Sequence, residues 1–216
     1  MKIFLDTSDV DVIRKHYETG LIDGVTTNPT LMMQAGRDPV EVIKEISSLF
    51  PEHASISAEV VGDTAEEMVS QAKDYHSISK NITIKVPCTV EGLKACKMFS
   101  DKSVSVNVTL IFSVEQAILS AKSGATYLSP FIGRCEDNNI DGIGLIDSIK
   151  KVYGINNIST NILAASIRNV VQVGQVFEAG ANIVTLPPSI FEEMYKHDLT
   201  DQGIKQFDKD WKKLNS

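Results

Sequence analysis

Runs of alternating apolar and polar residues recur along the chain, separated by stretches with helical spacing. In residues 81–87, for example, Ile82, Ile84 and Val86 alternate with polar residues, and residues 104–112 show the same two-residue period. That period is typical of β-strands, whose side chains point alternately to opposite faces. The pattern predicts strands at residues 2–7, 24–28, 55–62, 81–87, 104–112, 126–133, 159–166 and 182–188.

The segments between the predicted strands carry helix signals. Residues 38–50 have apolar residues at helical spacing, and residues 64–75 begin with Thr64, followed three positions later by Glu67. That pair forms a capping box, in which each residue satisfies a free backbone N–H of the other. Two further helices that end in glycine are predicted at residues 113–124 and 166–180.

Strand and helix alternate through the whole chain, which indicates a parallel sheet. An open doubly wound sheet and a closed (β/α)₈ barrel both meet this description. The first predicted strand-to-helix connection, DTSDVD, lacks the glycine-rich pattern of dinucleotide-binding sheets. The number of strands favours a (β/α)₈ barrel (TIM barrel). We expect residues 1–216 to form one domain, since no linker or low-complexity segment divides them.

The last segment, residues 198–216, predicts one more helix. Ile204, Phe207 and Trp211 follow one another at intervals of three and four and therefore share a helix face. One interpretation is a helix that closes the bottom of its own barrel. The other is a C-terminal arm, residues 200–214, that packs on a neighbouring subunit.

Polar residues gather on one face of most predicted strands, near their carboxyl ends. In a barrel of this kind alternate side chains point into the lumen, and active sites lie at the carboxyl ends of the strands. Burying so many polar groups is costly unless they satisfy one another or a ligand. Alternatively, some of these strands are edges whose polar faces meet water. The predicted lumen residues are Asp6, Thr26, Asn28, Glu59, Lys85, Asn107, Thr109, Ser129, Phe131 and Ser166.

Lys85 gives this predicted lumen a candidate nucleophile. Burial disfavours an ammonium, and a neutral amine attacks a ketone to form a Schiff base. The imine withdraws electrons, so that a C–C bond to a hydroxyl-bearing carbon can break. Asp6 is the candidate base for that hydroxyl, and Glu59, with a water held by Thr109, is the candidate proton shuttle for imine formation. Each of these residues has a simpler interpretation when it is considered alone. Lys85 and Glu59 would be surface residues, and Asp6 would cap the first helix.

Two arginines follow the sixth and seventh predicted strands, Arg134 and Arg168, and Ser166 ends the seventh. Arginine binds phosphate through two parallel hydrogen bonds, and a nearby helix N-terminus adds to such a site. Each arginine alone could be a solvated loop residue. Together they favour a phosphorylated ligand, and Asn28, Asn107 and Ser129 suit sugar hydroxyls.

Composition and charge exclude several classes of function. Apolar residues make up 43% and charged residues 23%, as in ordinary globular proteins. A net charge of −7 argues against a general binder of nucleic acid or of anionic membranes. The N-terminus has no long apolar run, and no segment approaches the length of a membrane span, so we expect neither a signal peptide nor a membrane partner.

The three cysteines, Cys88, Cys96 and Cys135, have no metal-binding or disulfide-framework spacing. We therefore expect no disulfide and no zinc site, and the cytoplasm as the compartment. Cys88 lies three residues from Lys85. It could be a redox-sensitive thiol beside the site, but a small loop residue is the simpler interpretation.

Several motifs together resemble one protein family over the whole chain. They are FLDT (4–7), GVTTNPTL (24–31), ISAEV (56–60), IKVP (84–87), NVTLIFS (107–113), SPFIGR (129–134), ILAASIRN (162–169) and QFDKDW (206–211). On these motifs the chain resembles the transaldolases, specifically the branch of short transaldolases and fructose-6-phosphate aldolases. The segment NPTLMMQAGRD (28–38) departs from the family pattern, which bears on loop details.

The resemblance implies a (β/α)₈ barrel and a Schiff-base mechanism without metal or cofactor. It implies Lys85 as the imine-forming lysine, Asp6 as the acid–base for C–C cleavage, and Glu59 and Thr109 as the holders of a catalytic water. Sugar-phosphate substrates would be bound through their dihydroxyacetone portion by Asn28, Asn107 and Ser129, and through their phosphate by Arg134, Ser166 and Arg168. It also implies a homo-oligomer, a pentamer or decamer, in which the C-terminal helix reaches over a neighbour.

Two positions separate the activities within this branch. The fructose-6-phosphate aldolases resemble one another in having Gln and Tyr where this sequence has Glu59 and Phe131, the pair that is similar to transaldolases. A phenol could help to protonate the enamine and release dihydroxyacetone, whereas Phe131 cannot. We therefore expect a transaldolase, with a fructose-6-phosphate aldolase and a non-catalytic sugar-phosphate-binding barrel as the alternatives.

Overall fold

The computed structural model describes residues 1–214, and its strands form a closed parallel barrel in the order of the chain. β1 pairs with both β2 and β8, which confirms the predicted (β/α)₈ barrel and excludes the open sheet. Each strand falls inside its predicted range. The strands are β1 (Lys2–Asp6), β2 (Gly24–Thr26), β3 (Ser55–Glu59), β4 (Ile82–Pro87), β5 (Val106–Ile111), β6 (Tyr127–Pro130), β7 (Asn161–Ala164) and β8 (Ile183–Leu186).

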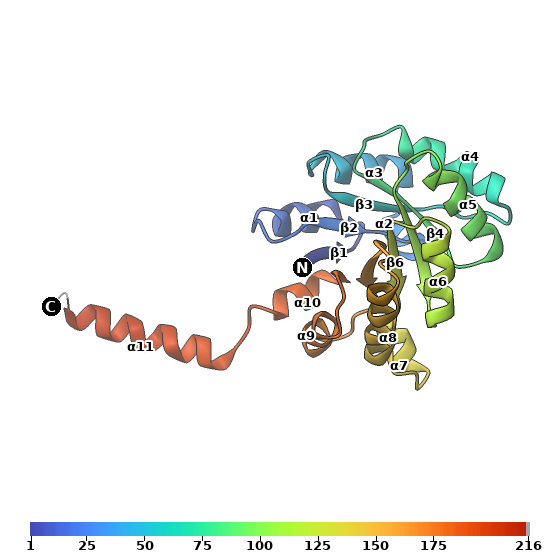
Figure 1. Cartoon of the computed structure of the whole chain (residues 1–216). Helices are drawn as coiled ribbons and strands as arrows, with labels where there is room; N and C mark the ends of the chain where they lie inside the picture. The colour runs from blue at the N-terminus through green and yellow to red at the C-terminus, as the bar shows by residue number, and fades with distance from the viewer. Residues whose placement is uncertain (215–216) are drawn as a thin grey trace.

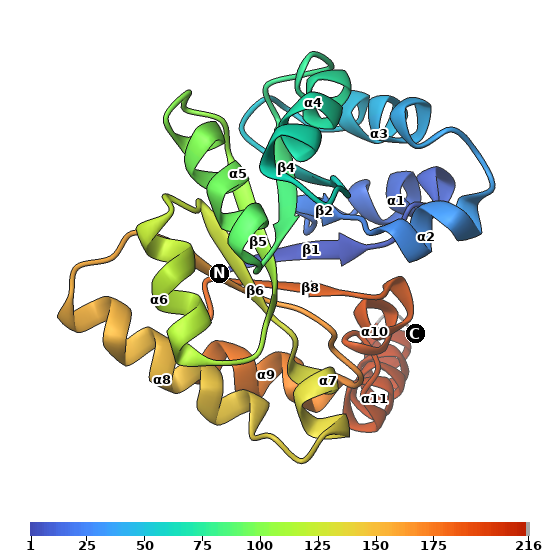
Figure 2. The same ribbon diagram turned by 90° about the vertical axis from the view of Figure 1, so that its right-hand side faces the viewer.

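Helices follow the strands and surround the barrel (Figure 2). The predicted capping box of Thr64 and Glu67 is present at the start of α4. The helices are α1 (Val10–Tyr17), α2 (Pro29–Ala35), α3 (Pro39–Ser48), α4 (Ala65–His76), α5 (Val90–Ser100), α6 (Val114–Lys122), α7 (Ile132–Asp137), α8 (Gly142–Ile155), α9 (Val170–Glu178), α10 (Pro188–Glu193) and α11 (Asp198–Leu214).

The start predicted for α9, at residue 166, is wrong. Ser166 has a left-handed backbone with φ near 60°, which is incompatible with a right-handed helix. The helix begins instead after Asn169, whose side chain accepts a hydrogen bond from the backbone N–H of Gln172. Asn is among the best N-cap residues for this reason. The residues before Asn169 are therefore free to form the rim of the barrel.

The main core lies between the outer face of the barrel and the apolar faces of the helices. Leu5, Ile56 and Ile84 point outward from their strands and are fully buried, and helix residues such as Ile13 and Ile43 pack against this layer. This follows from the two-residue period of the strands and the 3.6-residue period of the helices. The opposite face of each strand is left for the lumen.

Apolar side chains fill much of the lower lumen. Phe4, Leu163 and Ile183 form a small buried cluster against Tyr127, whose ring lies 6.5 Å from that of Phe4 in an edge-to-face contact. Gly24 makes room for this plug, because a Cβ there would lie 2.4 Å from the Ser55 carbonyl oxygen and 2.9 Å from the Phe4 ring. The barrel is thus closed at the bottom, and its open space lies toward the carboxyl ends of the strands.

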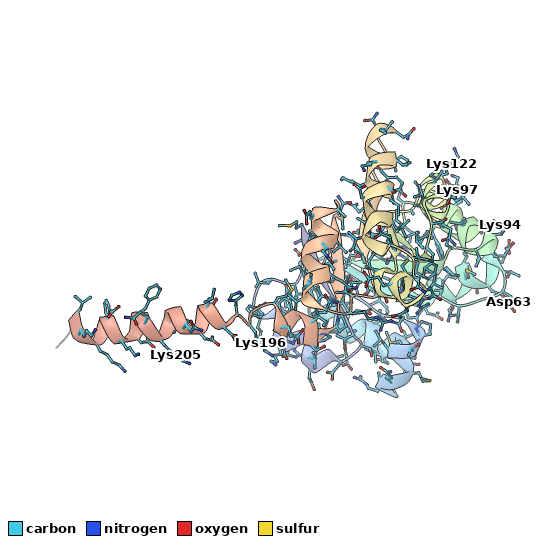
Figure 3. All side chains as sticks on the ribbon, turned by 90° about the horizontal axis from the view of Figure 1, so that it is seen from below. Asp63, Lys94, Lys97, Lys122, Lys196 and Lys205 are labelled. Atoms are coloured by element: carbon cyan, nitrogen blue, oxygen red, sulfur yellow. The ribbon has the colours of Figure 1, made fainter. Side chains whose placement is uncertain are left out.

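The C-terminal helix α11 does not cover the bottom of its own barrel. Figure 1 shows it extending away from the other elements after α10, and in Figure 3 its side chains, Lys205 among them, stand clear of the barrel. None of its residues is buried, and Ile204 and Phe207 are 53% and 74% exposed. The interpretation of this segment as a cap on its own barrel is therefore wrong.

Candidate active site

A cavity of about 210 Å³ opens at the carboxyl ends of the strands. Such a position is where barrel enzymes of this type place their chemistry. Nine of the residues predicted for the site line it, whereas Glu59, Asn107 and Thr109 do not. The lining residues are Asp6, Thr26, Asn28, Lys85, Ser129, Phe131, Arg134, Ala165, Ser166, Ile167, Arg168, Thr185 and Pro187.

Lys85 lies inside the barrel and not on its surface. The residue is 4% exposed, and its Nζ donates to the backbone carbonyl of Thr27 at 3.0 Å and pairs with Glu59 Oε2 at 2.9 Å. The pair forms because Glu59 and Lys85 face each other across β3 and β4. An isolated ammonium would be strongly disfavoured at this depth, so the carboxylate compensates the burial of the amine. The same carboxylate is positioned to receive a proton from Lys85.

Glu59 also borders a second cavity, of about 320 Å³, on the other side of the barrel wall. This cavity lies among α2, α3 and α4 and is lined mainly by apolar side chains such as Met32 and Tyr75. Asn28 belongs to the walls of both cavities. Glu59 therefore pairs with Lys85 in the lumen and also borders this second cavity.

Asp6 lies at the end of β1 and accepts a hydrogen bond from Thr26 Oγ1 at 2.7 Å. Burial raises the pKa of this carboxyl above its ordinary value, and the charge of Lys85 and the Thr26 hydrogen bond lower it in part. The cap of α1 is Asp9, which accepts from the backbone N–H groups of the first turn. The interpretation of Asp6 as a helix cap is therefore wrong, and its carboxyl faces the cavity.

Amide and hydroxyl groups complete the upper lumen. Asn107 is fully buried, accepts from Ser129 Oγ at 2.8 Å, and donates to Ser57 Oγ at 3.5 Å. Thr109 Oγ1 is the one buried side-chain polar atom without a hydrogen-bond partner among the described residues. Buried hydroxyls are nearly always satisfied, so this atom is suited to a water or a substrate group. Asn28 caps α2 through its side-chain oxygen, which accepts from the backbone N–H of Leu31.

The rim of the cavity is basic. The Arg134 guanidinium lies over the Phe131 ring, 4.9 Å from its centre, and Arg168 pairs with Asp137 at 2.9 Å. Gly133 allows this arrangement, because a Cβ there would lie 2.6 Å from the side chain of Arg168. Ser166 stands between the two arginines in the chain and lines the same cavity. The predicted anion-binding residues therefore gather at one mouth.

Sequence reasoning missed Thr185. This residue of β8 is buried, lines the cavity, and lies 2.6 Å from Thr26, oxygen to oxygen. It sits within the apolar run IVTLP, which offers no polar face to notice. Its alternation with Ile183, a residue of the lumen plug, is the signal that could have assigned it to the lumen.

Cys88 does not line the cavity and is half-buried. Burial raises the pKa of its thiol, which lowers the thiolate fraction that redox chemistry requires. Within residues 1–214, no three His, Cys, Asp or Glu side chains converge on a possible metal site. No described helix is both long and apolar enough to cross a lipid bilayer.

Comparisons with known proteins agree with this geometry. A family model described as transaldolase/fructose-6-phosphate aldolase matches residues 3–216. A probable transaldolase from Caulobacter vibrioides is 49% identical, covering 98% of this chain and 96% of that protein. One from Geobacter metallireducens is 48% identical, covering 99% of both.

Among solved structures, a thiamine phosphate pyrophosphorylase from Pyrococcus furiosus is similar, with a TM-score of 0.60. It is 16% identical, and the match covers 86% of this chain and 85% of that one. At this identity the likeness concerns the fold alone.

The raised pKa of Asp6 predicts a stabilising effect of Asp6→Asn near neutral pH. The folded protein holds the Asp6 proton more tightly than the unfolded chain, so this group contributes stability below the ordinary pKa of 3.8, and that contribution is lost as the pH rises through the raised value. Asn removes the buried charge and should raise the free energy of unfolding at pH 7, with the difference shrinking toward pH 3.8. Urea unfolding across this range measures it.

The matched control for that experiment is Asp63→Asn, since Asp63 is exposed and does not line the cavity. It should leave the free energy of unfolding nearly unchanged at both pH values. An Asp6→Asn protein that is less stable than the wild type at pH 7 would contradict the electrostatic account of the site.

Proposed function

The chain belongs to the transaldolase/fructose-6-phosphate aldolase family, and on that premise we propose that it is a transaldolase. It moves a dihydroxyacetone unit from a ketose phosphate, such as sedoheptulose 7-phosphate or fructose 6-phosphate, to an aldose phosphate, such as glyceraldehyde 3-phosphate or erythrose 4-phosphate. The observation that carries the proposal is a buried lysine, paired with Glu59, in the same cavity as Asp6 and below two arginines. This reaction belongs to the pentose phosphate pathway.

The first step is formation of an imine on Lys85. Glu59, 2.9 Å away, accepts a proton from the ammonium, and the free amine attacks the ketone carbon of the donor. Loss of water from the carbinolamine requires a proton on the leaving hydroxyl. Glu59 returns it through a water held against Thr109 Oγ1, whose lack of a partner in the described chain supports this role.

The second step is cleavage of the C–C bond. Asp6 removes the proton of the donor's C4 hydroxyl, the C3–C4 bond breaks, and its electrons move into the protonated imine to give an enamine on Lys85. The raised pKa of Asp6 suits this exchange, because a carboxyl whose pKa lies nearer neutrality both accepts and returns a proton. Asn28, Asn107 and Ser129 bind the hydroxyls and carbonyl of the dihydroxyacetone portion.

The phosphate of the substrate binds at the basic rim. Arg134 and Arg168 line the mouth of the cavity together with Ser166. The guanidinium of Arg168 pairs with Asp137, and its backbone N–H donates to the side chain of Gln172, so both parts of the residue are held in place. Two guanidinium groups provide the paired hydrogen bonds that a phosphate accepts. The phosphate thereby anchors the far end of the sugar while its ketone reaches Lys85.

Phe131 favours transfer over release of the three-carbon unit. Its ring lines the cavity and packs against Arg134 and Phe112, and it carries no proton donor. The enamine is therefore not protonated at this wall and persists until an aldose acceptor arrives. A fructose-6-phosphate aldolase that releases dihydroxyacetone is the second candidate, since the family includes both activities.

We further propose that the chain is one barrel domain that works as a cytoplasmic homo-oligomer, a pentamer or decamer, with residues 200–214 as an arm on a neighbouring subunit. The exposed apolar face of α11, including Ile204 and Phe207, supports an intermolecular contact, because a monomer rarely leaves such a face in water. The cysteines are free thiols, which is typical of reducing compartments.

Borohydride reduction in the presence of fructose 6-phosphate should attach the sugar to the Lys85 peptide, because hydride reduces the imine that the ketose forms there. Lys85→Ala should show no adduct, with turnover lowered roughly 1,000-fold or more while the fold remains intact by circular dichroism. Lys80→Ala, which removes an exposed lysine beside the same strand, is the matched control and should retain both adduct and turnover. No adduct on the wild-type protein would favour the non-catalytic sugar-phosphate-binding barrel.

Wild-type protein should consume fructose 6-phosphate only when erythrose 4-phosphate is present. Phe131→Tyr should raise acceptor-independent release of dihydroxyacetone, roughly tenfold to a hundredfold, because its phenol can donate a proton to the enamine. A coupled assay for free dihydroxyacetone measures both. Phe112→Tyr, a neighbouring ring outside the cavity, should have no such effect. Rapid release by the wild type without acceptor would instead indicate the aldolase.

Phe207→Glu should weaken assembly without unfolding the barrel, since Phe207 is 74% exposed within its own chain. Burying a phenylalanine is worth about 1.5–3 kcal/mol per contact, and a charge there reverses that gain. Light scattering after size exclusion should show smaller particles. Lys205→Glu, on the same helix, should assemble normally. A wild-type protein that is monomeric at assay concentration would exclude the arm contact.

A further inference from the structure

Thr185 on β8 lies beside the proposed base, and the mechanism above leaves it without a role. It is 2% exposed, and its Oγ1 lies 2.6 Å from Thr26 Oγ1, which lies 2.7 Å from Asp6 Oδ1. Barrel closure sets β2 and β8 on the two sides of β1. The two threonines therefore meet in the lumen and form a short chain of hydroxyls that ends on one oxygen of the carboxylate.

The number of hydroxyl protons determines which group donates in each of these two hydrogen bonds. A threonine hydroxyl has one proton to donate, and an ionised carboxylate has none. The contact between Thr26 and Asp6 therefore uses the Thr26 proton. Since that proton is committed, the contact between the two threonines must use the proton of Thr185. The described residues provide no other acceptor for Thr185, and a buried hydroxyl donor that is left unpaired is costly.

We propose that Thr185 is a positioning residue for the acid–base step: it donates to Thr26 and so strengthens the hydrogen bond from Thr26 to Asp6 Oδ1, which leaves Asp6 Oδ2 as the oxygen that exchanges the proton of the substrate hydroxyl. This inference rests on the proposed function. No described residue bonds to Oδ2, so the substrate hydroxyl has a free acceptor there. The proton arrives on Oδ2, so Oδ1 accepts from Thr26 before and after C–C cleavage. The chain thus needs no rearrangement during the step, which is how preorganised polar groups lower a barrier.

The charges around Asp6 come from other elements. Lys85 faces it from β4 and pairs with Glu59 of β3, while Arg134 of α7 and Arg168 after β7 line the same cavity. From β2 and β8, the neighbours of β1, it meets only the hydroxyls of the chain. Burial raises the pKa of Asp6, and the Thr26 hydrogen bond lowers it. Without Thr185, Thr26 still donates to Oδ1, but a hydroxyl that no longer accepts a hydrogen bond is a weaker donor, so the pKa of Asp6 should rise further.

Three variants separate the hydroxyl of Thr185 from its packing. Thr185→Val keeps the shape and removes the donor, whereas Thr185→Ser keeps the donor and removes a methyl group. Thr83→Val is the matched control, because Thr83 is an equally buried lumen threonine whose hydroxyl meets Ser55 at 2.8 Å and is not connected to Asp6. Both valine variants remove one hydroxyl from a buried hydroxyl pair, and only one of those pairs reaches Asp6.

The kinetic readout is turnover of fructose 6-phosphate with erythrose 4-phosphate as a function of pH. Thr185→Val should lower kcat roughly threefold to tenfold, the effect of one hydrogen bond, and move the acid limb of kcat/KM to higher pH. Borohydride trapping on Lys85 should be unchanged, since imine formation does not use Asp6. Thr185→Ser should restore the wild-type profile, and Thr83→Val should retain it. A Thr185→Val profile equal to the wild type, or an equal loss in Thr83→Val, overturns the proposal.

A second readout does not depend on catalysis. Carbon NMR of protein labelled at the aspartate carboxyl carbon gives the titration of Asp6, whose signal is assigned by its loss in Asp6→Asn. The midpoint should lie at higher pH in Thr185→Val and at the wild-type pH in Thr185→Ser and Thr83→Val. An unmoved midpoint overturns the hydroxyl chain. A wild-type protein without adduct or turnover overturns the proposed function, and the titration still decides the role of Thr185.

Discussion

The buried pair of Lys85 and Glu59 is the interaction on which the upper half of the barrel depends. An ammonium in this position is tolerable because a carboxylate lies 2.9 Å away and a backbone carbonyl accepts a second hydrogen bond. Removing one member of such a pair typically costs about 3–5 kcal/mol, because the other charge is left buried. The same constraint makes the pair chemically useful, since a proton can move between its members without either leaving the lumen.

The rest of the lumen has two parts, one mainly apolar and one mainly polar. Below it, the rings and aliphatic side chains of Phe4, Tyr127 and Ile183 fill the barrel and keep water out. Around it, polar groups bond mainly to one another, as in the contact of Asn107 with Ser129. Water-excluded surroundings strengthen every electrostatic interaction at the pair, so the apolar plug contributes to the chemistry as well as to the fold.

Two features connect this interior with the outside. Glu59 borders a separate cavity among α2, α3 and α4, in addition to its pair with Lys85 in the lumen. The basic rim, by contrast, is formed from the segments that follow β6 and β7, where loops can vary without disturbing the barrel. The arrangement places the Lys85–Glu59 pair and the basic rim on different strands of the barrel.

Much of this protein could be predicted from its sequence, because the information involved is local. The two-residue period of the strands identified all eight strands and the inward face of most of them, and hence the lumen positions of Asp6, Glu59 and Lys85. The sequence also predicted the start of a helix where a side chain caps it, as Thr64 does together with Glu67. The family motifs then added roles that spacing alone could not supply. The predicted start of α9 at Ser166 was wrong, because the left-handed backbone of this residue is not visible in the sequence pattern.

What only the tertiary structure decided is which distant residues meet. Closure of the barrel brings β8 beside β1, and so brings Thr185 to the chain of hydroxyls on Asp6. The sequence run IVTLP gives no sign of this contact. Likewise the apolar face of α11 was readable from its spacing, but its position away from the barrel was not. The physical reason is the same in both cases. Periodicity fixes the direction of a side chain within its own element, whereas its neighbours depend on how elements far apart in the chain pack together.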